Sequence, residues 1–481
     1  MIGFEEMYSW VKDLPIIDWH NHLDMQMIAA DNPLGSLYEV WVKSDPYKHR
    51  TMRICGEPER LITGDADEDE KWAAWVRTLP KLVGNPLFAW AKMEMEWLNS
   101  FNTEAQRRRG TEGNCGWLRE LENVSLAEWT PSKILKAFNV EYISPCVGAG
   151  EMEKLGQLES LEHLDSLENL DYLVVPSLRL NAGDDVSQET LERFHAAGCR
   201  VVDVSVDDVG DIPLRSRATI DNRRPISGRQ STCDFGSVAA FAATHDWTML
   251  LHLGALRETS ARLRAAAGPA GGFAGMRVPV DPMAVADFLN ELESTPNNFS
   301  QKNGLRTSDT GLQETSHSGF GSKSEVRSLK SSHTAKEPSG CLPRTILLSL
   351  NPEAHAQLAV LAGSFVEDGV PGKVQLGPAW WWCDHEDGIR DVLEKNAAYG
   401  VLSTFIGMTT DSRSLLSFVR HDYFRRILCK WVAEKVASGA FPNDEELLRP
   451  MLENICYRNA RNVFSHKEHK GHKEGLFTND N

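Results

Sequence analysis

The stretch LPIIDWHNHLD (14–24) opens the pattern that decides the fold, because a short apolar run there ends abruptly in polar residues. Seven further runs of similar length follow, each closed by Gly, Pro or polar residues, and several lead into amphipathic stretches. The predicted strands are LPIIDWH (14–20), VEYISPC (140–146), DYLVVPSLR (171–179), RVVDVSV (200–206), TMLLHLG (248–254), TILLSLN (345–351), GKVQLG (372–377) and LSTFIGM (402–408). Eight βα units can close without leaving a sheet edge, so the pattern predicts an α/β protein with a (β/α)8 barrel. An open doubly wound sheet of six or seven strands is the alternative.

Composition excludes several classes of protein. The 481 residues carry 51 Lys plus Arg and 68 Asp plus Glu, and the net charge of −17 disfavours nucleic acid and anionic membrane as partners. No apolar run approaches the roughly 20 residues of a membrane span, and the acidic start lacks the basic region of a signal peptide. The nine cysteines include no CxxC pair, which is typical of free thiols in a reducing compartment. We therefore expect a cytoplasmic protein.

The spacing of the predicted strands also predicts the domain organisation. Residues 1–24 and 132–481 form the barrel, and the Trp-rich, helix-like residues 25–131 form a helical insertion or lid after strand one. Residues 298–341 are rich in serine and poor in apolar residues, which predicts a disordered insert. The polar tail at 465–481 is predicted to be disordered as well.

Two histidines, His20 and His22, end the first predicted strand. Residues i and i+2 of a strand point to the same side, so both imidazoles can face one metal ion. Neutral imidazole suits zinc and its first-row neighbours, and a catalytic site needs a third protein ligand and one open position. An incidental pair of histidines is the alternative.

Asp411 and Arg413 follow the eighth predicted strand in GMTTDSRS. In a closed barrel this strand adjoins the first, so Asp411 and the histidine pair are expected at the same rim. The carboxylate can ligate a metal or act as a base, and the guanidinium can bind a substrate carboxylate through two parallel hydrogen bonds. Taken alone, Asp411 can instead cap a helix that begins near Ser412.

Two other strand ends carry candidate side chains. His252 ends the fifth predicted strand in LLHLGALR, and Trp380, Trp381 and Trp382 follow the seventh. Three consecutive tryptophans cannot all face the core on one side, so at least one can form a wall for a sugar ring. A satisfied polar histidine and a packed lid are the alternatives.

Together these motifs resemble the uronate isomerase family of the amidohydrolase superfamily. The resemblance covers residues 15 to about 464 apart from the 298–341 insert, and it rests on WHNH, DPYKHRTMR, ITGDADEDEKW, GNPLFAW, LHLGALR, TILLSLNP, GKVQLGPAWWW, GMTTDSRS and RHDYFRRILC. It implies a distorted (β/α)8 barrel with a helical insertion after strand one and one divalent ion, usually zinc. The implied activity is isomerisation of D-glucuronate to D-fructuronate or of D-galacturonate to D-tagaturonate.

The resemblance also implies roles for single residues. The implied metal ligands are His20, His22 and Asp411. Catalytic roles are implied for Asp411, Tyr47 and Arg413. Substrate contacts are implied for Arg179, Asp203, His252 and Trp380 or Trp381.

The chain departs from the family pattern beside Tyr47 and between strands two and four. Pro46 stands where the family usually has a histidine. The family's Thr-Thr-Asp-Asp-Pro is replaced by ISPCVG (143–148), its Arg-Pro-Asp by Arg179-Leu180-Asn181, and its Asp-His-Gly by Asp203-Val204-Ser205. A missing acid or base costs roughly 10²- to 10⁴-fold in rate, so the activity can be weak, altered or absent.

The leading expectation is an aldose–ketose isomerase that moves a proton between C2 and C1 of a hexuronate through an enediol. We expect a homo-oligomer that binds a small sugar acid and neither nucleic acid nor membrane. A metal-dependent hydrolase of a sugar-acid lactone or ester is one alternative. A uronate-binding paralogue that has lost its activity is the other.

Overall fold

The computed structural model describes residues 1–101, 126–151, 173–181, 184, 186–206, 209–211, 235–257, 259–268, 271–295 and 342–465. The predicted disordered insert at 298–341 lies outside the described residues, and so does the predicted disordered tail apart from Ser465. Within the described ranges, no helix combines the length and the apolar character that a membrane span requires.

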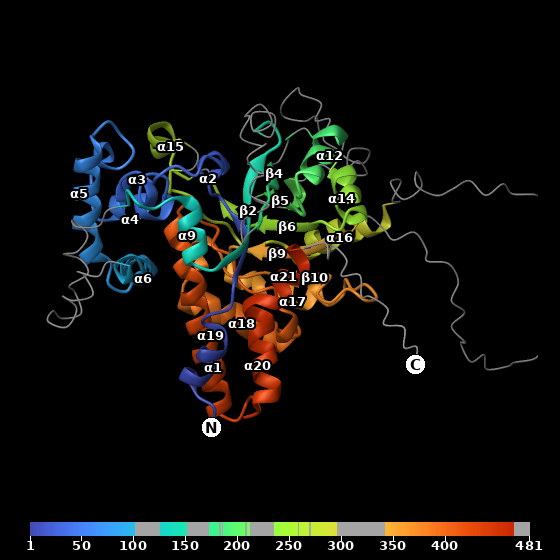
Figure 1. Cartoon of the computed structure of the whole chain (residues 1–481). Helices are drawn as coiled ribbons and strands as arrows, with labels where there is room; N and C mark the ends of the chain where they lie inside the picture. The colour runs from blue at the N-terminus through green and yellow to red at the C-terminus, as the bar shows by residue number, and fades with distance from the viewer. Residues whose placement is uncertain are drawn as a thin grey trace, which may run out of the picture.

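Seven parallel strands form a curled central sheet in the order β1-β2-β4-β5-β6-β9-β10 (Figure 1). Every residue of β5 and β6 is buried, which is typical of parallel strands covered on both faces. The strands correspond to seven of the eight predicted ones, which confirms the predicted α/β class. Their bounds are β1 (Ile16–Asn21), β2 (Val140–Gly148), β4 (Ser177–Asn181), β5 (Val201–Ser205), β6 (Thr248–Leu253), β9 (Arg344–Ser349) and β10 (Val374–Leu376).

The predicted strand at 171–179 is divided in two. The short strand β3 (Leu173–Val174) pairs with Tyr142 and Ile143 of β2, whereas β4 pairs with residues 146–148 of the same strand. The break falls at residues 175–176, where Pro176 has no N–H to donate to a sheet ladder.

The prediction of an eighth strand at 402–408 is wrong. A 3-10 turn (Leu402–Thr404) is followed by irregular backbone, in which Gly407 and Asp411 have positive φ angles of 77° and 47°. Such residues cannot continue an extended strand. The segment nevertheless bridges the two ends of the sheet, because the Ile406 N–H donates to the Gln375 side chain of β10 (2.9 Å) and the Asp411 N–H donates to the His20 carbonyl of β1 (3.1 Å). The ring is closed by this irregular segment, as in a distorted barrel.

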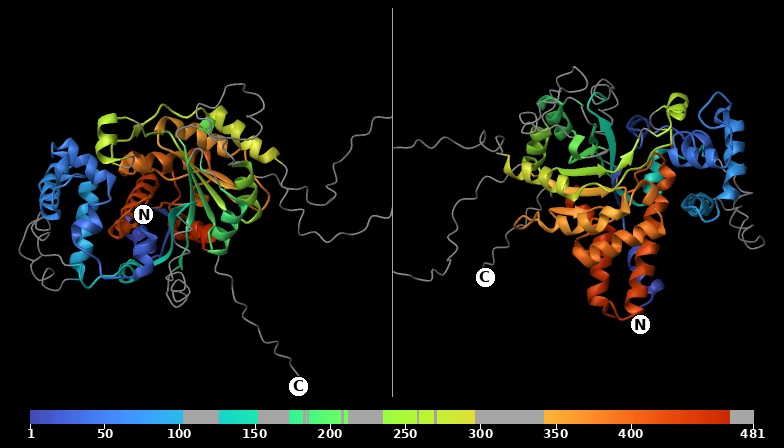
Figure 2. Two further views of the ribbon diagram at one scale, coloured as in Figure 1. Left: turned by 90° about the horizontal axis from the view of Figure 1, so that it is seen from above. Right: turned by 180° about the vertical axis from the view of Figure 1, so that it is seen from behind.

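Helices surround the curled sheet (Figure 2). Their buried faces share one hydrophobic cluster with the strands, and this cluster forms the main core. The surrounding helices are α1 (Phe4–Val11), α12 (Gln188–Ala196), α14 (Phe235–Thr244), α16 (Pro282–Ser294), α17 (His355–Ala362), α18 (Glu386–Tyr399), α19 (Val419–Ala437), α20 (Glu445–Glu453) and α21 (Asn459–Phe464).

The described chain between β1 and β2 is helical and lies to one side of the sheet (Figure 2). It forms a second hydrophobic cluster that includes Trp41, Trp75 and Trp90. The helices are α2 (Met25–Ala30), α3 (Leu37–Trp41), α4 (Pro46–Ile54), α5 (Glu68–Thr78), α6 (Pro86–Ser100) and α9 (Pro131–Ala137). The first five begin at side chains that accept hydrogen bonds from first-turn N–H groups, namely Asp24, Ser36, Asp45, Asp67 and Asn85. The domain boundaries at 25 and 131 stay predictions.

The described part of the segment after β6, residues 255–276, packs against this helical region. The strands β7 (Ala255–Leu256) and β8 (Gly275–Met276) pair with each other and flank helix α15 (Ala261–Ala267). Gly272 has a φ of 79°, and a Cβ there would overlap the carbonyl oxygen of Pro46 in α4. The close approach of the two backbones requires a glycine at this position.

Candidate active site

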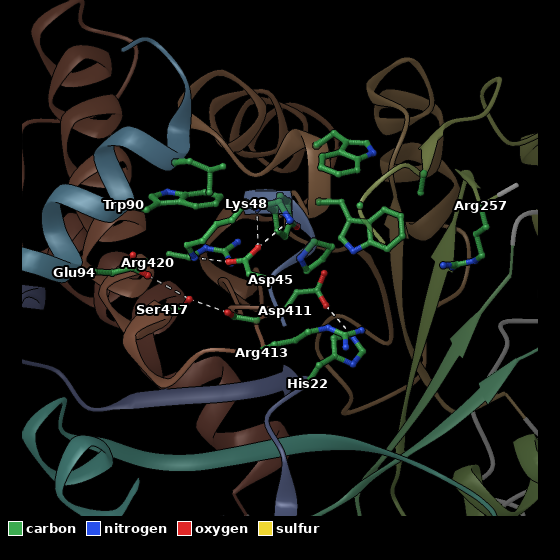
Figure 3. Close-up of a pocket in the computed structure, with 18 of the residues that line it drawn as sticks. His22, Asp45, Lys48, Trp90, Glu94, Arg257, Asp411, Arg413, Ser417 and Arg420 are labelled. Atoms are coloured by element: carbon green, nitrogen blue, oxygen red, sulfur yellow. Dashed lines mark hydrogen bonds and ion pairs between the residues drawn. The ribbon is translucent and has the colours of Figure 1, made fainter. Parts of the chain in front are cut away.

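His20 and His22 lie at the end of β1, and Asp411 lies beside them in the closing segment. The Asp411 N–H donates to the His20 carbonyl (3.1 Å), and the His22 N–H donates to the Ser412 carbonyl (2.8 Å). As a result, Asp411 Oδ1 lies 3.2 Å from His20 Nε2 and 3.1 Å from His22 Nε2. Figure 3 shows the pair formed by His22 and Asp411. The three predicted metal ligands therefore meet, although they are separated by almost the whole chain.

Asp18 fixes the segment that carries Asp411. Its buried carboxylate accepts hydrogen bonds from the Thr409 hydroxyl (2.9 Å), the Thr410 N–H (2.6 Å) and the Thr410 hydroxyl (2.8 Å). His421 of α19 approaches the same carboxylate at 3.2 Å. Burial would raise the pKa of Asp18, but His421 and Thr410 hold that pKa below its ordinary value. An ionised Asp18 thus connects β1 to the irregular segment where regular strand pairing is lost.

The surroundings of His20 favour a positive charge on its imidazole. Burial opposes the charged form, but Cys146, Asp203 and Asp411 raise the pKa of His20 well above its ordinary value. Burial would also raise the pKa of Asp411, yet the hydrogen bonds and charges of both histidines hold that pKa below its ordinary value. A metal ion can take the place of the proton between an imidazole and a carboxylate, because metal binding releases protons from its ligands.

The donor set fits a divalent ion. Neighbouring ligands 2.0–2.1 Å from a tetrahedral ion are expected about 3.3 Å apart, close to the 3.1 and 3.2 Å separations around Asp411 Oδ1. Asp411 Oδ2 is buried and has no hydrogen-bond partner among the described residues. Burial lowers the pKa of His22 to about 4, which keeps its imidazole neutral and its lone pair available. The geometry and the chemistry of these side chains support a divalent metal site.

Two groups of three potential ligand residues include His20, and neither of them contains Asp411. One is His20 with His22 and Cys146, and the other is His20 with Asp203 and His252; within each group the ligand atoms lie within 4.8 Å of one another. Asp203 is already engaged, because it accepts hydrogen bonds from His252 Nδ1 (2.7 Å) and from an Arg179 guanidinium nitrogen (2.5 Å). Asp411 therefore has more free acceptor capacity for an ion than Asp203 has.

A cavity of about 480 Å³ adjoins His22 and Asp411 (Figure 3). Six of the predicted residues line it, namely His22, Tyr47, Arg179, Trp381, Asp411 and Arg413. Among its described lining residues are six basic side chains (Lys48, Arg179, Arg257, Arg264, Arg413 and Arg420) and three acidic ones (Asp45, Glu94 and Asp411). The size is in the range of small-molecule sites, and the excess of positive charge suits a small anionic ligand.

Three of the predicted substrate-contact residues do not belong to the described cavity lining. Asp203, His252 and Trp380 are buried, and the His252 ring meets the Trp380 ring edge-on with centroids 4.6 Å apart. Asp203 is connected to the cavity through Arg179, which pairs with it and lines the cavity, and His252 is bonded to Asp203. Direct substrate contact by these three residues stays a prediction.

Helix α4 brings Tyr47 into the cavity. Pro46 occupies the first turn of this helix, where a missing N–H is tolerated, and Asp45 caps it by accepting from the Tyr47 N–H (2.8 Å). The Tyr47 ring packs edge-on against Trp382 and Trp90, and its hydroxyl has no hydrogen-bond partner among the described residues. Burial, reinforced by the Asp411 carboxylate, raises the pKa of Tyr47 well above its ordinary value, so the phenol keeps its proton at neutral pH.

The three consecutive tryptophans face different surroundings. Trp381 has a φ of 49°, which turns the chain so that Trp381 and Trp382 line the cavity while Trp380 is buried against His252. The Arg257 guanidinium lies over the Trp381 ring at 5.4 Å from its centroid. The prediction that at least one tryptophan forms a cavity wall is consistent with this arrangement.

Several lining residues were not predicted. Trp90 and Glu94 come from α6 and are four residues apart, so both lie on one face of this helix. Arg420 of α19 lies over the Trp90 ring at 4.2 Å and forms an ion pair with Asp384. The i, i+4 spacing could have indicated the shared face, but nothing in the sequence indicates that this face meets a cavity.

A family model described as glucuronate isomerase matches residues 4–219 and 308–464, which is more than half of the chain. This chain belongs to the glucuronate isomerase family. The proteins named uronate isomerase from Caldicellulosiruptor bescii, Caldicellulosiruptor saccharolyticus and Serratia proteamaculans are 31%, 30% and 30% identical to it, and each alignment covers 95% of both chains. The family predicted from the sequence motifs is confirmed.

Solved structures of this family have the same fold. The uronate isomerase of Thermotoga maritima superposes with a TM-score of 0.71 at 24% identity, covering 96% of this chain and 97% of that one. The glucuronate isomerase of Caulobacter crescentus gives a TM-score of 0.70 at 18% identity, covering 97% of this chain and 94% of that one. The overall fold of this chain is therefore that of known uronate isomerase structures.

Proposed function

We propose that this protein interconverts an aldohexuronate and its 2-keto isomer, D-glucuronate with D-fructuronate and D-galacturonate with D-tagaturonate. The observation that carries this proposal is the convergence of His20, His22 and Asp411 at the edge of a cationic cavity with tryptophan walls. The curated relatives that match 95% of the chain are named for the same activity.

His20, His22 and Asp411 would hold the divalent ion, and the proposed ion is zinc because two imidazoles and one carboxylate are an ordinary zinc ligand set. When bound, the ion supplies a Lewis acid that polarises the carbonyl and hydroxyl oxygens at C1 and C2 of the open-chain sugar.

Basic side chains on the cavity wall would bind the substrate carboxylate. Arg413 is exposed at the cavity and makes no described hydrogen bond or ion pair, so its guanidinium is available for a bidentate contact. Arg179 lines the same cavity but is held by Asp203, which fixes its orientation. Trp381 would pack against the sugar ring or chain. These contacts position the substrate and exclude water.

Asp411 and Tyr47 would divide the proton transfer between C2 and C1. The lowered pKa of Asp411 keeps it ionised and able to accept a proton, and the raised pKa of Tyr47 keeps its hydroxyl protonated and able to donate. Both side chains line the cavity. Pro46 stands where the family usually has a histidine, and the Tyr47 hydroxyl would supply the proton donor from α4.

The test is to load purified protein with one equivalent of zinc and to mix it with D-glucuronate or D-galacturonate in deuterated water. Proton NMR should show the ketose appearing together with deuterium at C2 of the recovered aldose. Uronate binding without ketose and without deuterium incorporation would contradict the proposal and favour a binding paralogue. Turnover of sugar-acid lactones in the absence of isomerisation would favour the hydrolase.

We also propose a cytoplasmic homo-oligomer. The described cysteines are all free, which agrees with a reducing compartment. Large apolar side chains at the surface, such as Ile54, Val278 and Val366, can contribute to a subunit interface. Sedimentation velocity would test the assembly, and a single species at the monomer mass would contradict it.

A further inference from the structure

The end of β2 places a thiol next to the candidate metal centre. Cys146 is partly exposed and lies in the ISPCVG segment that replaces the family's Thr-Thr-Asp-Asp-Pro. Its sulfur lies 3.4 Å from His20 Nδ1 and 3.4 Å from Asp203 Oδ2, and it accepts a hydrogen bond from the Ser177 hydroxyl at 3.5 Å. Cys146 therefore bridges a predicted metal ligand and a buried carboxylate.

The direction of these hydrogen bonds follows from the chemistry of Asp203. Its carboxylate oxygens accept hydrogen bonds from the Arg179 guanidinium and from His252 Nδ1 (2.7 Å), so Asp203 is the acceptor toward Cys146 as well. The Cys146 S–H then donates to Asp203, and the sulfur lone pairs are left to accept from His20 Nδ1–H. A histidine with its proton on Nδ1 presents the lone pair of Nε2, the atom that faces Asp411 at 3.2 Å.

We propose that Cys146 is a positioning residue of the metal centre, which holds His20 in the tautomer that binds the ion through Nε2. Histidines that bind metal almost always donate their other N–H to a carboxylate, a carbonyl or water. Here the Cys146 thiol accepts that hydrogen bond from His20 and donates its own hydrogen bond to Asp203. The inference rests on the proposed function, because it requires an ion at His20, His22 and Asp411.

The geometry favours positioning over direct ligation by sulfur. The nitrogen of His20 that approaches Cys146 is Nδ1, and the nitrogen that approaches Asp411 is Nε2. One imidazole binds one ion through one of these two atoms. An ion bound by Nε2 and Asp411 thus leaves the Nδ1–H free to interact with Cys146.

The test compares zinc dissociation constants of the full-length wild type, Cys146→Ala and Cys146→Ser, measured by competition with a chromophoric chelator. Cys146→Ala should bind zinc about 10- to 100-fold more weakly. Cys146→Ser should recover most of the affinity, because a hydroxyl can accept from His20 and donate to Asp203. Cys456→Ala, at another partly exposed cysteine, is the matched control and should bind zinc like the wild type.

The absorption spectrum of the cobalt(II)-loaded wild type gives a second measurement that needs no variant. If Cys146 positions His20 without binding the ion, the spectrum lacks the intense near-ultraviolet band of a thiolate bound to cobalt. Such a band would overturn the proposal, and so would unchanged zinc affinity in Cys146→Ala. A wild type that retains no zinc at all would instead contradict the proposed function. Circular dichroism of the metal-free variants would show whether each is folded.

Discussion

Asp411→Asn removes the negative charge that both imidazoles approach while it preserves the volume of the side chain. Structural zinc bound by four protein ligands has an apparent binding free energy of about 10–16 kcal/mol, so one ligand contributes about 2.5–4 kcal/mol. A factor of ten in the dissociation constant corresponds to about 1.4 kcal/mol. The zinc dissociation constant of Asp411→Asn should therefore rise by about 10²- to 10³-fold, since both histidines would remain but would lose the carboxylate that lies 3.1–3.2 Å from each.

The assay is competition between the metal-free protein and a chromophoric zinc chelator at neutral pH. Asp391→Asn is the matched control, because the half-buried Asp391 also pairs with a buried histidine, His355, at 2.7 Å but does not belong to the described cavity lining. The control should bind zinc like the wild type. Equal zinc affinity in Asp411→Asn and in the control would refute the reasoning.

Three other substitutions test the roles of cavity residues. Tyr47→Phe should lower kcat by roughly 10²- to 10⁴-fold while zinc affinity stays unchanged, and steady-state kinetics with unchanged kcat would exclude Tyr47 as the acid. Arg413→Ala should raise KM for the uronate by about 10- to 100-fold through loss of charged hydrogen bonds, and an unchanged KM would place the carboxylate elsewhere. Burial raises the pKa of Glu94 in the folded protein. Above the ordinary glutamate pKa of about 4.3, Glu94 therefore ionises more readily in the unfolded chain than in the folded one, and the free energy of unfolding falls as the pH rises. Glu94→Gln, which can still accept from Trp41, should accordingly be more stable than the wild type at pH 7 and equally stable near pH 4 by urea unfolding, and a wild type that is more stable at pH 7 would contradict this.

Most of the fold could be predicted because apolar runs mark buried parallel strands. Seven predicted strands are present, but the eighth run, LSTFIGM, forms no strand although it is as apolar as the others. Its closing role depends on the positive φ angles of Gly407 and Asp411 and on the Asp18 carboxylate. Such side-chain hydrogen bonds leave no periodic pattern in a sequence.

The proximity of the candidate metal ligands could be predicted for a topological reason. Closing a barrel brings its first and last segments together, and this holds whether the last segment is a regular strand or not. The Asp411 N–H still pairs with the His20 carbonyl, so the carboxylate meets both imidazoles as expected.

The rest of the cavity could not be predicted because it depends on how the helical insertion packs against the barrel. Glu94 and Trp90 lie on one face of α6, but the sequence does not show which helix face meets the cavity. Which tryptophan is buried depends on a single backbone turn at Trp381. The sequence distinguishes Cys146 only by its place in a departure from the family pattern, because its contact with His20 joins two strands that are far apart in sequence.

Anomalous diffraction from crystals of the zinc-loaded protein, measured on both sides of the zinc absorption edge, tests the central claim most directly. The account predicts one strong peak per chain, within bonding distance of His20 Nε2, His22 Nε2 and an Asp411 carboxylate oxygen. A peak bound instead by Asp203 and His252, with Asp411 outside its coordination sphere, would contradict it.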